Sequence, residues 1–225
     1  MSKIFFDCEF TGLHKNTSLI SIGLVADNGQ KFYAEITDFD RNQIDNWLQA
    51  NVIDNLILLN EGSKIENGVN INGKLSLYDF YIKDTAKNVS IELRKWLNQY
   101  KTIEWVSDVC HYDFVLLIDL VYGHALAMPY GKHNAACHDI NQDIAKYYNI
   151  SEIEAFDKSR EEILEEHGVT IEGKKHNALY DAEVIKAIYD IMNKPKMLGQ
   201  LIIDAVNNNF KIKIEGEDNE RDSDN

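Results

Sequence analysis

The stretch Ile4-Phe5-Phe6-Asp7-Cys8-Glu9-Phe10-Thr11-Gly12-Leu13 decides the fold of this chain. An apolar run leads directly into two acidic residues one position apart, and a Thr-Gly turn follows. Because successive side chains on a strand point to opposite faces, Asp7 and Glu9 share one face. Two adjacent carboxylates repel each other, and burial at the end of an apolar strand makes their charge costly. A bound cation is the simplest compensation, so we expect the rest of the chain to bring further ligands to this pair.

The composition predicts one sizeable domain with a substantial core. The chain has 225 residues, of which 44% are hydrophobic and 10% aromatic. We predict a single domain over residues 1–210 and an acidic, disordered tail over 211–225. The net charge of −14 argues in general against nucleic acid as a partner. Residues 215–225 hold six acids and one arginine, and acids that bind divalent cations would not repel a phosphate. The negative net charge is therefore a weaker argument against a nucleic-acid partner, but it still counts against one.

The cysteines and the apolar segments indicate where the protein resides. Cys8, Cys110 and Cys137 are an odd number of thiols without metal-ligand spacing, which predicts reduced cysteines in an intracellular compartment. The first residues enter a strand pattern at once and leave no room for a signal peptide. The sequence has no apolar run long enough to span a bilayer. We therefore expect a cytoplasmic protein that does not bind a membrane.

The order of the predicted elements indicates the fold class. Strands are predicted over 3–7, 18–26 and 31–37, and Asn28-Gly29 between the last two is typical of a tight hairpin. Residues 60–84 are predicted to form a hairpin inserted over the core, and 103–107 a buried strand. One or two helices are predicted over 41–59, and single helices over 86–99, 112–122, 138–148, 152–166, 177–192 and 198–207. A meander followed by alternating strands and helices predicts an α/β fold with a mixed sheet.

Two helical acids stand where apolar residues are expected. Asp113 and Asp181 each lie on the apolar stripe of a predicted helix. Their stripes consist of Leu116, Leu117 and Leu120 for the first helix, and Ile185, Ile188 and Met192 for the second. Either acid alone could be a first-turn residue that the positive helix end stabilises by about 0.3–1 kcal/mol. Together with Asp7 and Glu9, four acids that converge from one strand and two helices favour a metal site.

His176 lies five residues before Asp181, in the loop that is expected to enter the same helix. A lone histidine near a helix start is more often a surface or capping residue than a catalyst. Here the side chain would lie over the helix end that presents Asp181. A neutral imidazole at that place could accept a proton from a water molecule at the metal site.

The motifs around these residues resemble those of the DEDD exonuclease superfamily. Phe6-Asp7-Cys8-Glu9-Phe10-Thr11-Gly12-Leu13 looks like the first exonuclease motif. His176-Asn177-Ala178-Leu179-Tyr180-Asp181-Ala182 is similar to the third motif of the DEDDh branch. In the second motif, the family has an Asn and then an aromatic-Asp pair that opens a helix. Tyr112-Asp113-Phe114 supplies the pair, but Val109 stands in place of the Asn, and Asp108 is an alternative to Asp113 as the ligand.

The resemblance covers about residues 3–192 in outline. Leu19–Ala26, the Asn28-Gly29 turn and Phe32-Tyr33-Ala34-Glu35 look most like the small bacterial and phage exoribonucleases of the RNase AS type, which are similar to RNase T in fold. This resemblance implies a ribonuclease H-like mixed β-sheet with helices on both faces. It also implies the release of nucleoside 5′-monophosphates from RNA 3′ ends. Many relatives are homodimers, so a homodimer is expected as well.

The resemblance further implies a role for each of the singled-out residues. Asp7, Glu9, Asp113 and Asp181 would hold two Mg²⁺ or Mn²⁺ ions, and His176 would act as the general base. Phe10, Thr11, Gly12 and Leu13 would hold the terminal nucleotide. The alternative for these four is a turn flanked by two core residues.

Three rival functions remain open from the sequence. A DEDDh exonuclease that acts on DNA, with single-stranded DNA as its partner, would carry the same motifs, because the acids contact only phosphate. A nucleic-acid-binding relative without turnover is less favoured, since the acids and the histidine are all intact. A Ca²⁺-binding module is the weakest alternative, because the sequence has no contiguous acidic loop of the EF-hand kind.

Overall fold

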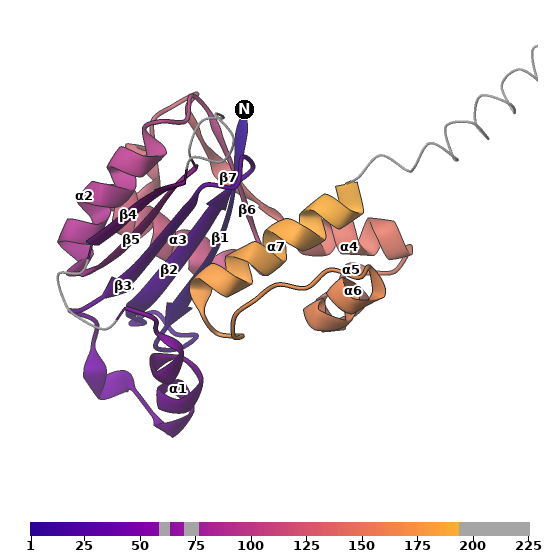
Figure 1. Ribbon diagram of the computed structural model, residues 1–225, viewed down its shortest axis with the longest axis horizontal. Coiled ribbons are helices and arrows are strands. Elements are labelled where there is room, and N and C mark those ends of the chain that lie inside the picture. Colours follow the sequence, from indigo (N-terminus) through magenta and orange to yellow (C-terminus); the bar gives the residue numbers. More distant parts are fainter. Residues whose placement is uncertain (59–63, 70–76, 194–225) are drawn as a thin grey trace, which may run out of the picture. The chain divides into compact units, whose positions relative to one another are not determined.

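The structure is a computed structural model that describes residues 1–58, 64–69 and 77–193. Its central element is a seven-stranded sheet (Figure 1). The strand order is β4-β5-β3-β2-β1-β6-β7. The strands are β1 (Ser2–Phe10), β2 (Leu19–Ala26), β3 (Lys31–Ile36), β4 (Lys64–Val69), β5 (Leu77–Asp84), β6 (Ile103–Ser107) and β7 (His133–Asp139). The pairs β1–β2, β2–β3 and β4–β5 are antiparallel, whereas β1–β6, β3–β5 and β6–β7 are parallel. The predicted mixed sheet is therefore confirmed.

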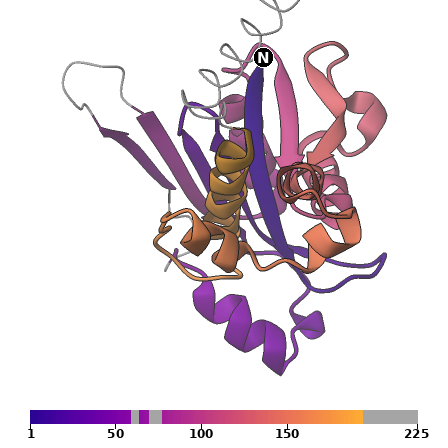
Figure 2. The same cartoon turned by 90° about the vertical axis from the view of Figure 1, so that its right-hand side faces the viewer.

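Helices cover both faces of this sheet (Figure 2). On one face, Ile4, Phe6 and Cys8 of β1 share a core with α2 (Ala86–Leu97) and α3 (His111–Tyr122). On the other face, Phe5 shares a core with four helices. These are α4 (Ile140–Tyr148), α5 (Glu152–Asp157), α6 (Arg160–Glu166) and α7 (Ala178–Asn193). The alternation along β1 thus assigns even-numbered side chains to the α2–α3 layer and leaves Asp7 and Glu9 on the α7 side.

The prediction missed β7. Residues 133–139 form this edge strand, where the sequence predicts a helix from residue 138, and α4 begins only at Ile140. The strand reads His-Asn-Ala-Ala-Cys-His-Asp, which has neither apolar alternation nor β-branched residues. Its parallel pairing with β6 holds it in the sheet, so a tertiary contact overrides the local pattern.

Two predicted helical segments, 41–59 with one or two helices and 152–166 with a single helix, each consist of several shorter elements in the structure. Residues 41–59 contain the 3₁₀ turns η1 (Arg41–Gln43) and η2 (Ile53–Asn55) on either side of α1 (Asn46–Asn51). Residues 152–166 form α5 and α6 because the Ser159 side chain accepts a hydrogen bond from the amide of Glu162 and starts a new helix.

The predicted hairpin over residues 60–84 corresponds to β4 and β5, whose connecting residues 70–76 lie outside the described part. Because β5 also pairs in parallel with β3, these strands continue the central sheet, and the expectation that they lie over the core is wrong. The predicted helix over 198–207 and the tail over 211–225 lie outside the described residues. Among the helices that are described, none has the length and apolar character needed to cross a membrane.

Gly23 in β2 determines how closely α7 approaches the sheet. A Cβ atom at Gly23 would lie 2.3 Å from the carbonyl oxygen of Ala178, in the first turn of α7. Gly23 is the partner of Asp7 in the pairing of β1 with β2. The absence of a side chain at residue 23 therefore lets the first turn of α7 pack directly on the sheet beside Asp7.

Candidate active site

The carboxyl half of β1 presents the two acids of the first motif. β6 pairs with the Ser2–Phe5 half of β1, so β1 continues past the last paired residue of β6. In this continuation, the amide of Cys8 donates a 2.8 Å hydrogen bond to Oδ1 of Asp113. The chain that leaves β6 therefore places the first turn of α3 against the segment of β1 that carries Asp7 and Glu9.

Asp113 lies on the buried side of α3, as the periodicity predicts. Its side chain is 8% exposed, and Leu117 and Val121 on the same stripe are fully buried. Leu116 and Leu120 are partly buried against the same core. An acid in this position gains some stabilisation from the helix N-terminus and from the Cys8 amide.

Asp108, the alternative ligand, has a different environment. The guanidinium of Arg160 contacts both its oxygens, with Nε 2.6 Å from Oδ2 and a terminal nitrogen 2.8 Å from Oδ1. Asn141 donates a further 2.9 Å hydrogen bond to Oδ1. Asp108 is thus a neutralised acid, and Asp113 has the greater free capacity for a ligand.

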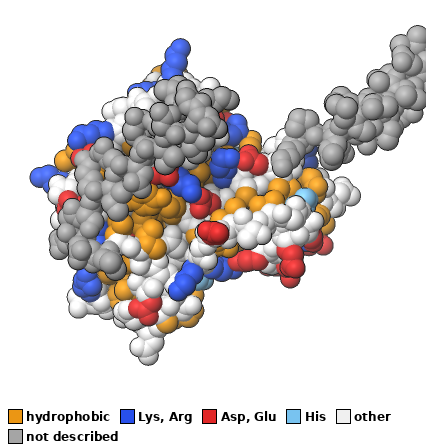
Figure 3. Space-filling view, viewed as in Figure 1, with side chains coloured by type: hydrophobic (Ala, Val, Ile, Leu, Met, Phe, Trp, Pro, Cys, Tyr) orange, Lys and Arg blue, Asp and Glu red, His pale blue; other side chains and the backbone are white. Residues whose placement is uncertain are grey.

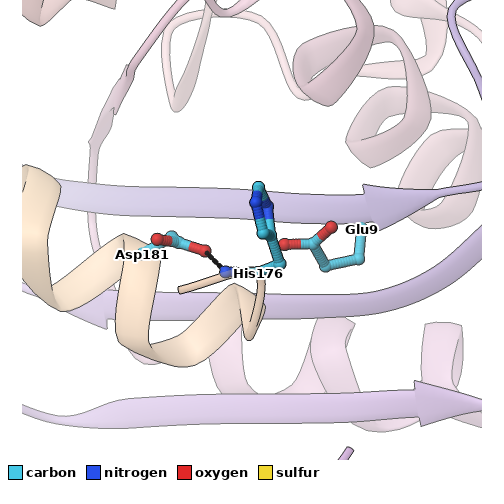
Figure 4. Close-up of side chains that lie close together, drawn as sticks. All are labelled: Glu9, His176 and Asp181. Carbon is cyan, nitrogen blue, oxygen red and sulfur yellow. Dashed lines mark hydrogen bonds between the residues drawn. The ribbon is translucent and has the colours of Figure 1, made fainter. Parts of the chain in front are cut away.

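The third motif places His176 and Asp181 beside Glu9 (Figure 4). One ligand atom from each of these three side chains lies within 4.8 Å of the other two. The backbone N–H of His176 donates a 2.9 Å hydrogen bond to Oδ2 of Asp181. The loop before α7 and the first turn of α7 therefore turn both groups toward β1.

The four acids share one electrostatic feature, a raised pKa. Burial, followed by the charges of Asp113, Asp181 and Glu9, raises the pKa of Asp7 well above its ordinary value. Burial and the nearby charges of Asp181 and Asp113 raise the pKa of Glu9 to about 8. Burial also raises the pKa of Asp181 to about 7 and that of Asp113 to about 6. The cluster therefore resists full ionisation on its own, and a cation would relieve the repulsion.

His176 has the opposite tendency. Burial and the charge of Lys175 lower its pKa, which keeps the imidazole neutral near neutral pH.

The Trp47 ring contacts the His176 imidazole edge to face, with ring centroids 5.2 Å apart. The sequence pattern places Trp47 among the apolar positions of a helix, but its side chain is 53% exposed. A tryptophan beside the candidate base was therefore missed, and nothing in the local pattern distinguishes it from a core residue.

All nine predicted site residues line one cleft of about 760 Å³. The cleft is also lined by three cations, each of which has an acidic partner. Lys158 pairs with Glu166, Arg160 with Asp108 and Lys175 with Glu161. Figure 3 shows that acidic side chains gather around α5 and α6 on the face that it displays. Because these three basic side chains are already paired with acids, they offer little positive charge to the phosphate of a substrate.

The residues after the first motif differ in their freedom to meet a ligand. Phe10 stacks on Tyr112, with ring centroids 5.7 Å apart. The Thr11 hydroxyl is buried and donates a 2.6 Å hydrogen bond to Gln43. Leu13, in contrast, is 77% exposed. Gly12 connects the buried and exposed parts of this turn, and all four predicted residues reach the cleft.

The mixed sheet with its two helical layers, and the acids and histidine gathered at the end of β1, define a protein with the ribonuclease H-like fold of the DEDDh exonucleases. The sequence comparison identifies the particular family. Residues 2–192 match the family described as the 3′-5′ exoribonuclease Rv2179c-like domain, and the chain belongs to this Rv2179c-like family.

The curated relatives are two mycobacterial sequences. The chain is similar to the 3′-5′ exoribonuclease Rv2179c of Mycobacterium tuberculosis strain H37Rv, with 37% identity over 54 residues. The same values apply to the 3′-5′ exoribonuclease MT2234.1 of strain CDC 1551. The matched segment covers 24% of this chain and 32% of either relative. The chain thus spans about a third of the length of these relatives.

Solved structures share the fold at low sequence identity. The nuclease domain of 3′hExo, a DEDDh family member bound to rAMP, superposes with a TM-score of 0.55 at 14% identity, covering 87% of this chain and 97% of that one. A 3′-exonuclease solved in a study of histone mRNA stem-loop recognition gives 0.55 at 12% identity, covering 85% of this chain and 63% of that one. These similarities support the fold that the topology defines.

Proposed function

We propose that this protein is a metal-dependent 3′-5′ exoribonuclease that removes nucleoside 5′-monophosphates from RNA 3′ ends. The observation that carries the proposal is the convergence of Asp7, Glu9, Asp113 and Asp181 with His176 in one cleft. Membership of the Rv2179c-like family supports RNA as the substrate. The family match over residues 2–192 also supports a single catalytic domain.

The four acids fit divalent cations. Carboxylate oxygens are the ligands that Mg²⁺ and Mn²⁺ prefer. Burial is the main cause of the raised pKa values of Glu9, Asp113 and Asp181, so these carboxyl groups carry a charge at a cost that a bound cation would reduce. We therefore assign Asp7, Glu9, Asp113 and Asp181 as the groups that hold two Mg²⁺ or Mn²⁺ ions. When bound, such ions supply the positive charge that a phosphodiester hydrolysis requires.

The side chains of the protein supply proton transfer and substrate positioning. A ring nitrogen of His176 takes a proton from the attacking water, and the lowered pKa of this residue keeps that nitrogen free. The water oxygen adds to phosphorus, the bond from phosphorus to the 3′ oxygen breaks, and that oxygen takes a proton from solvent and leaves as a hydroxyl group. Leu13 is exposed at the cleft and is available to contact the terminal nucleotide, while Phe10 and Thr11 fix the turn.

The setting of the enzyme is a further part of the proposal. The three cysteines are free in the structure, which supports a reducing, cytoplasmic location. The resemblance to the RNase T type supports a homodimer. Light scattering coupled to size-exclusion chromatography tests the dimer, because the mass in solution would be twice 25.9 kDa.

The test of the function uses 5′-labelled RNA and DNA oligomers of matched sequence, incubated with Mg²⁺, Mn²⁺ or a chelator. We expect single-nucleotide shortening of RNA from its 3′ end, which the chelator abolishes. Asp113→Asn should remove this activity. The control Asp119→Asn alters an exposed acid of the same helix and should retain it. Release of internal fragments, or shortening of DNA alone, would contradict the proposal.

A further inference from the structure

The backbone at His176 is held in an uncommon conformation. Its φ of 61° is in the left-handed region, which a residue with a side chain adopts only when its surroundings enforce it. The candidate base therefore depends on contacts that keep its loop in place. These contacts are made by side chains that do not line the cleft.

Asn177 makes the first set of these contacts. Its side chain is 6% exposed, and its Oδ1 accepts hydrogen bonds from the amides of Leu179 and Tyr180, at 3.2 and 3.3 Å, which caps α7. Its Nδ2 donates to the carbonyl oxygen of Asn55 at 3.0 Å and to the hydroxyl of Tyr33 at 3.3 Å. Both the oxygen and the nitrogen of the Asn177 side-chain amide are therefore hydrogen-bonded, and the orientation of this amide determines where α7 begins.

Glu35 fixes the direction of the hydrogen bond between Tyr33 and Asn177. The Tyr33 hydroxyl donates to Oε1 of Glu35 at 3.1 Å, so its lone pairs are left to accept from Asn177. The same Oε1 accepts from the amides of Ile57 and Leu58, at 2.7 and 2.8 Å. These contacts, with Tyr33 and Glu35 both fully buried, hold the carboxylate as an acceptor.

A second contact holds the other side of the loop. Nδ2 of Asn55 donates a 3.1 Å hydrogen bond to the carbonyl oxygen of Lys175. Since the carbonyl of Asn55 also accepts from Asn177, this one residue is bonded to both neighbours of His176. The loop therefore has fixed points on either side of the candidate base.

We propose that Tyr33, Asn55 and Asn177, oriented by Glu35, form a positioning network that holds His176 in its left-handed conformation and aims its imidazole at the acid cluster. This inference deepens the proposed function and rests on it, because it concerns the alignment of the general base. Among the described residues, none of the four side chains has a recorded hydrogen bond to the side chain of a cleft acid; the one direct link is through backbone, where the carbonyl oxygen of Asn177 accepts a 3.0 Å hydrogen bond from the amide of Asp181 in the first turn of α7. Their effect on the reaction passes through the backbone at residues 175–177.

The first test is Tyr33→Phe, which removes a single buried hydroxyl. The matched control is Tyr100→Phe, which removes a buried hydroxyl that donates to Gln30 at 2.9 Å, outside the network. Both variants should lose thermal stability, and Tyr33→Phe should lose more, since its hydroxyl bonds both Glu35 and Asn177 whereas that of Tyr100 bonds Gln30. Only Tyr33→Phe should lower kcat, by about tenfold with little change in KM, because misalignment of the base affects the transition state more than substrate binding.

A double-mutant cycle shows whether the effect passes through His176. In a His176→Ala background, Tyr33→Phe should cause no further decrease of the residual kcat. Asn55→Ala is a second variant, and it should lower kcat in the wild type and likewise have no effect in the His176→Ala background. A tenfold decrease that persists in that background, or an unchanged kcat for both variants, would overturn the proposal.

Amide hydrogen exchange supplies a readout that does not depend on activity. The N–H of His176, which bonds Asp181, should exchange faster in Tyr33→Phe than in the wild type or in Tyr100→Phe. Equal exchange at residues 175–178 in all three proteins would contradict the network. If the wild type fails to shorten RNA, the proposed function fails, whereas the exchange comparison still decides whether these side chains hold the loop.

Discussion

Glu9 and Glu35 occupy one row across the sheet but have opposite environments. Ser21 pairs with Glu9 on one side and with Glu35 on the other, so the three side chains share a face. Glu35 is fully buried, yet it receives hydrogen bonds from Tyr33 and two backbone amides and lies 3.0 Å from Nζ of Lys83. Glu9 lies among other acids, and burial raises its pKa to about 8.

This difference shows what separates a structural acid from a candidate ligand. Burial alone does not mark a metal site, since Glu35 is the more buried of the two. A candidate metal site is instead recognised as a group of buried acids that have too few cationic or hydrogen-bonding partners. The same contrast applies to Asp108, which Arg160 neutralises, and Asp113, whose pKa is raised to about 6.

Removal of an uncompensated acid should have the largest effect on activity. We expect Asp7→Asn and Asp181→Asn each to lower kcat by more than about a hundredfold, because cation binding supplies several kcal/mol of transition-state stabilisation. Thermal unfolding in chelator should stay the same or shift upward, since each change removes a repulsive charge. Rates of nucleotide release and melting temperatures measure the two effects. Retained cleavage by both variants would refute the role of these acids.

Removal of the partner of the compensated acid should instead affect stability. Lys83→Met leaves Glu35 buried without its cation, which we expect to cost about 3 kcal/mol. The control Lys95→Met breaks an ion pair with Glu92 whose lysine side chain is 65% exposed, and it should cost less than about 1 kcal/mol. Urea unfolding followed by circular dichroism measures both. Similar losses for the two variants would remove the distinction between Glu35 and a surface acid.

Gly23→Ala tests the contact that brings the third motif to the first. The added Cβ would meet the Ala178 carbonyl oxygen at 2.3 Å, and backbone cannot rotate away. We expect a stability loss of about 1–3 kcal/mol and a weaker response to Mn²⁺, because the first turn of α7 must shift away from Asp7. Melting temperatures with and without Mn²⁺ report both effects. An unchanged shift with Mn²⁺ would show that the site tolerates displacement of α7.

The smallest expected effect is the pH dependence of the metal-free protein. The native pKa values of Glu9 and Asp181 are raised to about 8 and 7, whereas carboxyl groups in the unfolded chain titrate near pH 4. Between these values the native state holds protons that the unfolded state has released. The contribution of the cluster to stability therefore decreases as pH rises from about 4 to about 8.

The wild type and Asp181→Asn in chelator isolate this contribution, because the other titrating groups are common to both. The unfolding free energy of the wild type should fall more steeply with pH than that of the variant, and Mn²⁺ should reduce the difference. Equal slopes in chelator would mean that the acids are not coupled.

The sequence predicts the parts of this site that depend on local pattern. The acids at positions 7 and 9 interrupt an apolar strand, and Asp113 and Asp181 interrupt apolar helical stripes, so each departs from the expected period. The meander, α2, α3 and α7 follow from the same periodicity, with bounds that differ from the structure by a few residues.

The parts that the sequence does not reveal depend on contacts between distant residues. The bond from Asn177 to Tyr33 joins positions 144 residues apart, and Arg160 meets Asp108 across 52 residues. The strand β7 likewise exists because β6 is there to pair with it. No local spacing encodes these contacts, and the left-handed His176 follows from them rather than from its neighbours in sequence.

The most direct test of the central claim is calorimetric titration of Mn²⁺ into the metal-free protein near neutral pH. The account predicts that the wild type and Asp108→Asn bind Mn²⁺, because Asp108 is already paired with Arg160, whereas Asp113→Asn loses most of the binding. Circular dichroism establishes that all three proteins are folded. Equal binding by the wild type and Asp113→Asn, or no binding by the wild type, would contradict the claim that these uncompensated acids form a divalent-cation site.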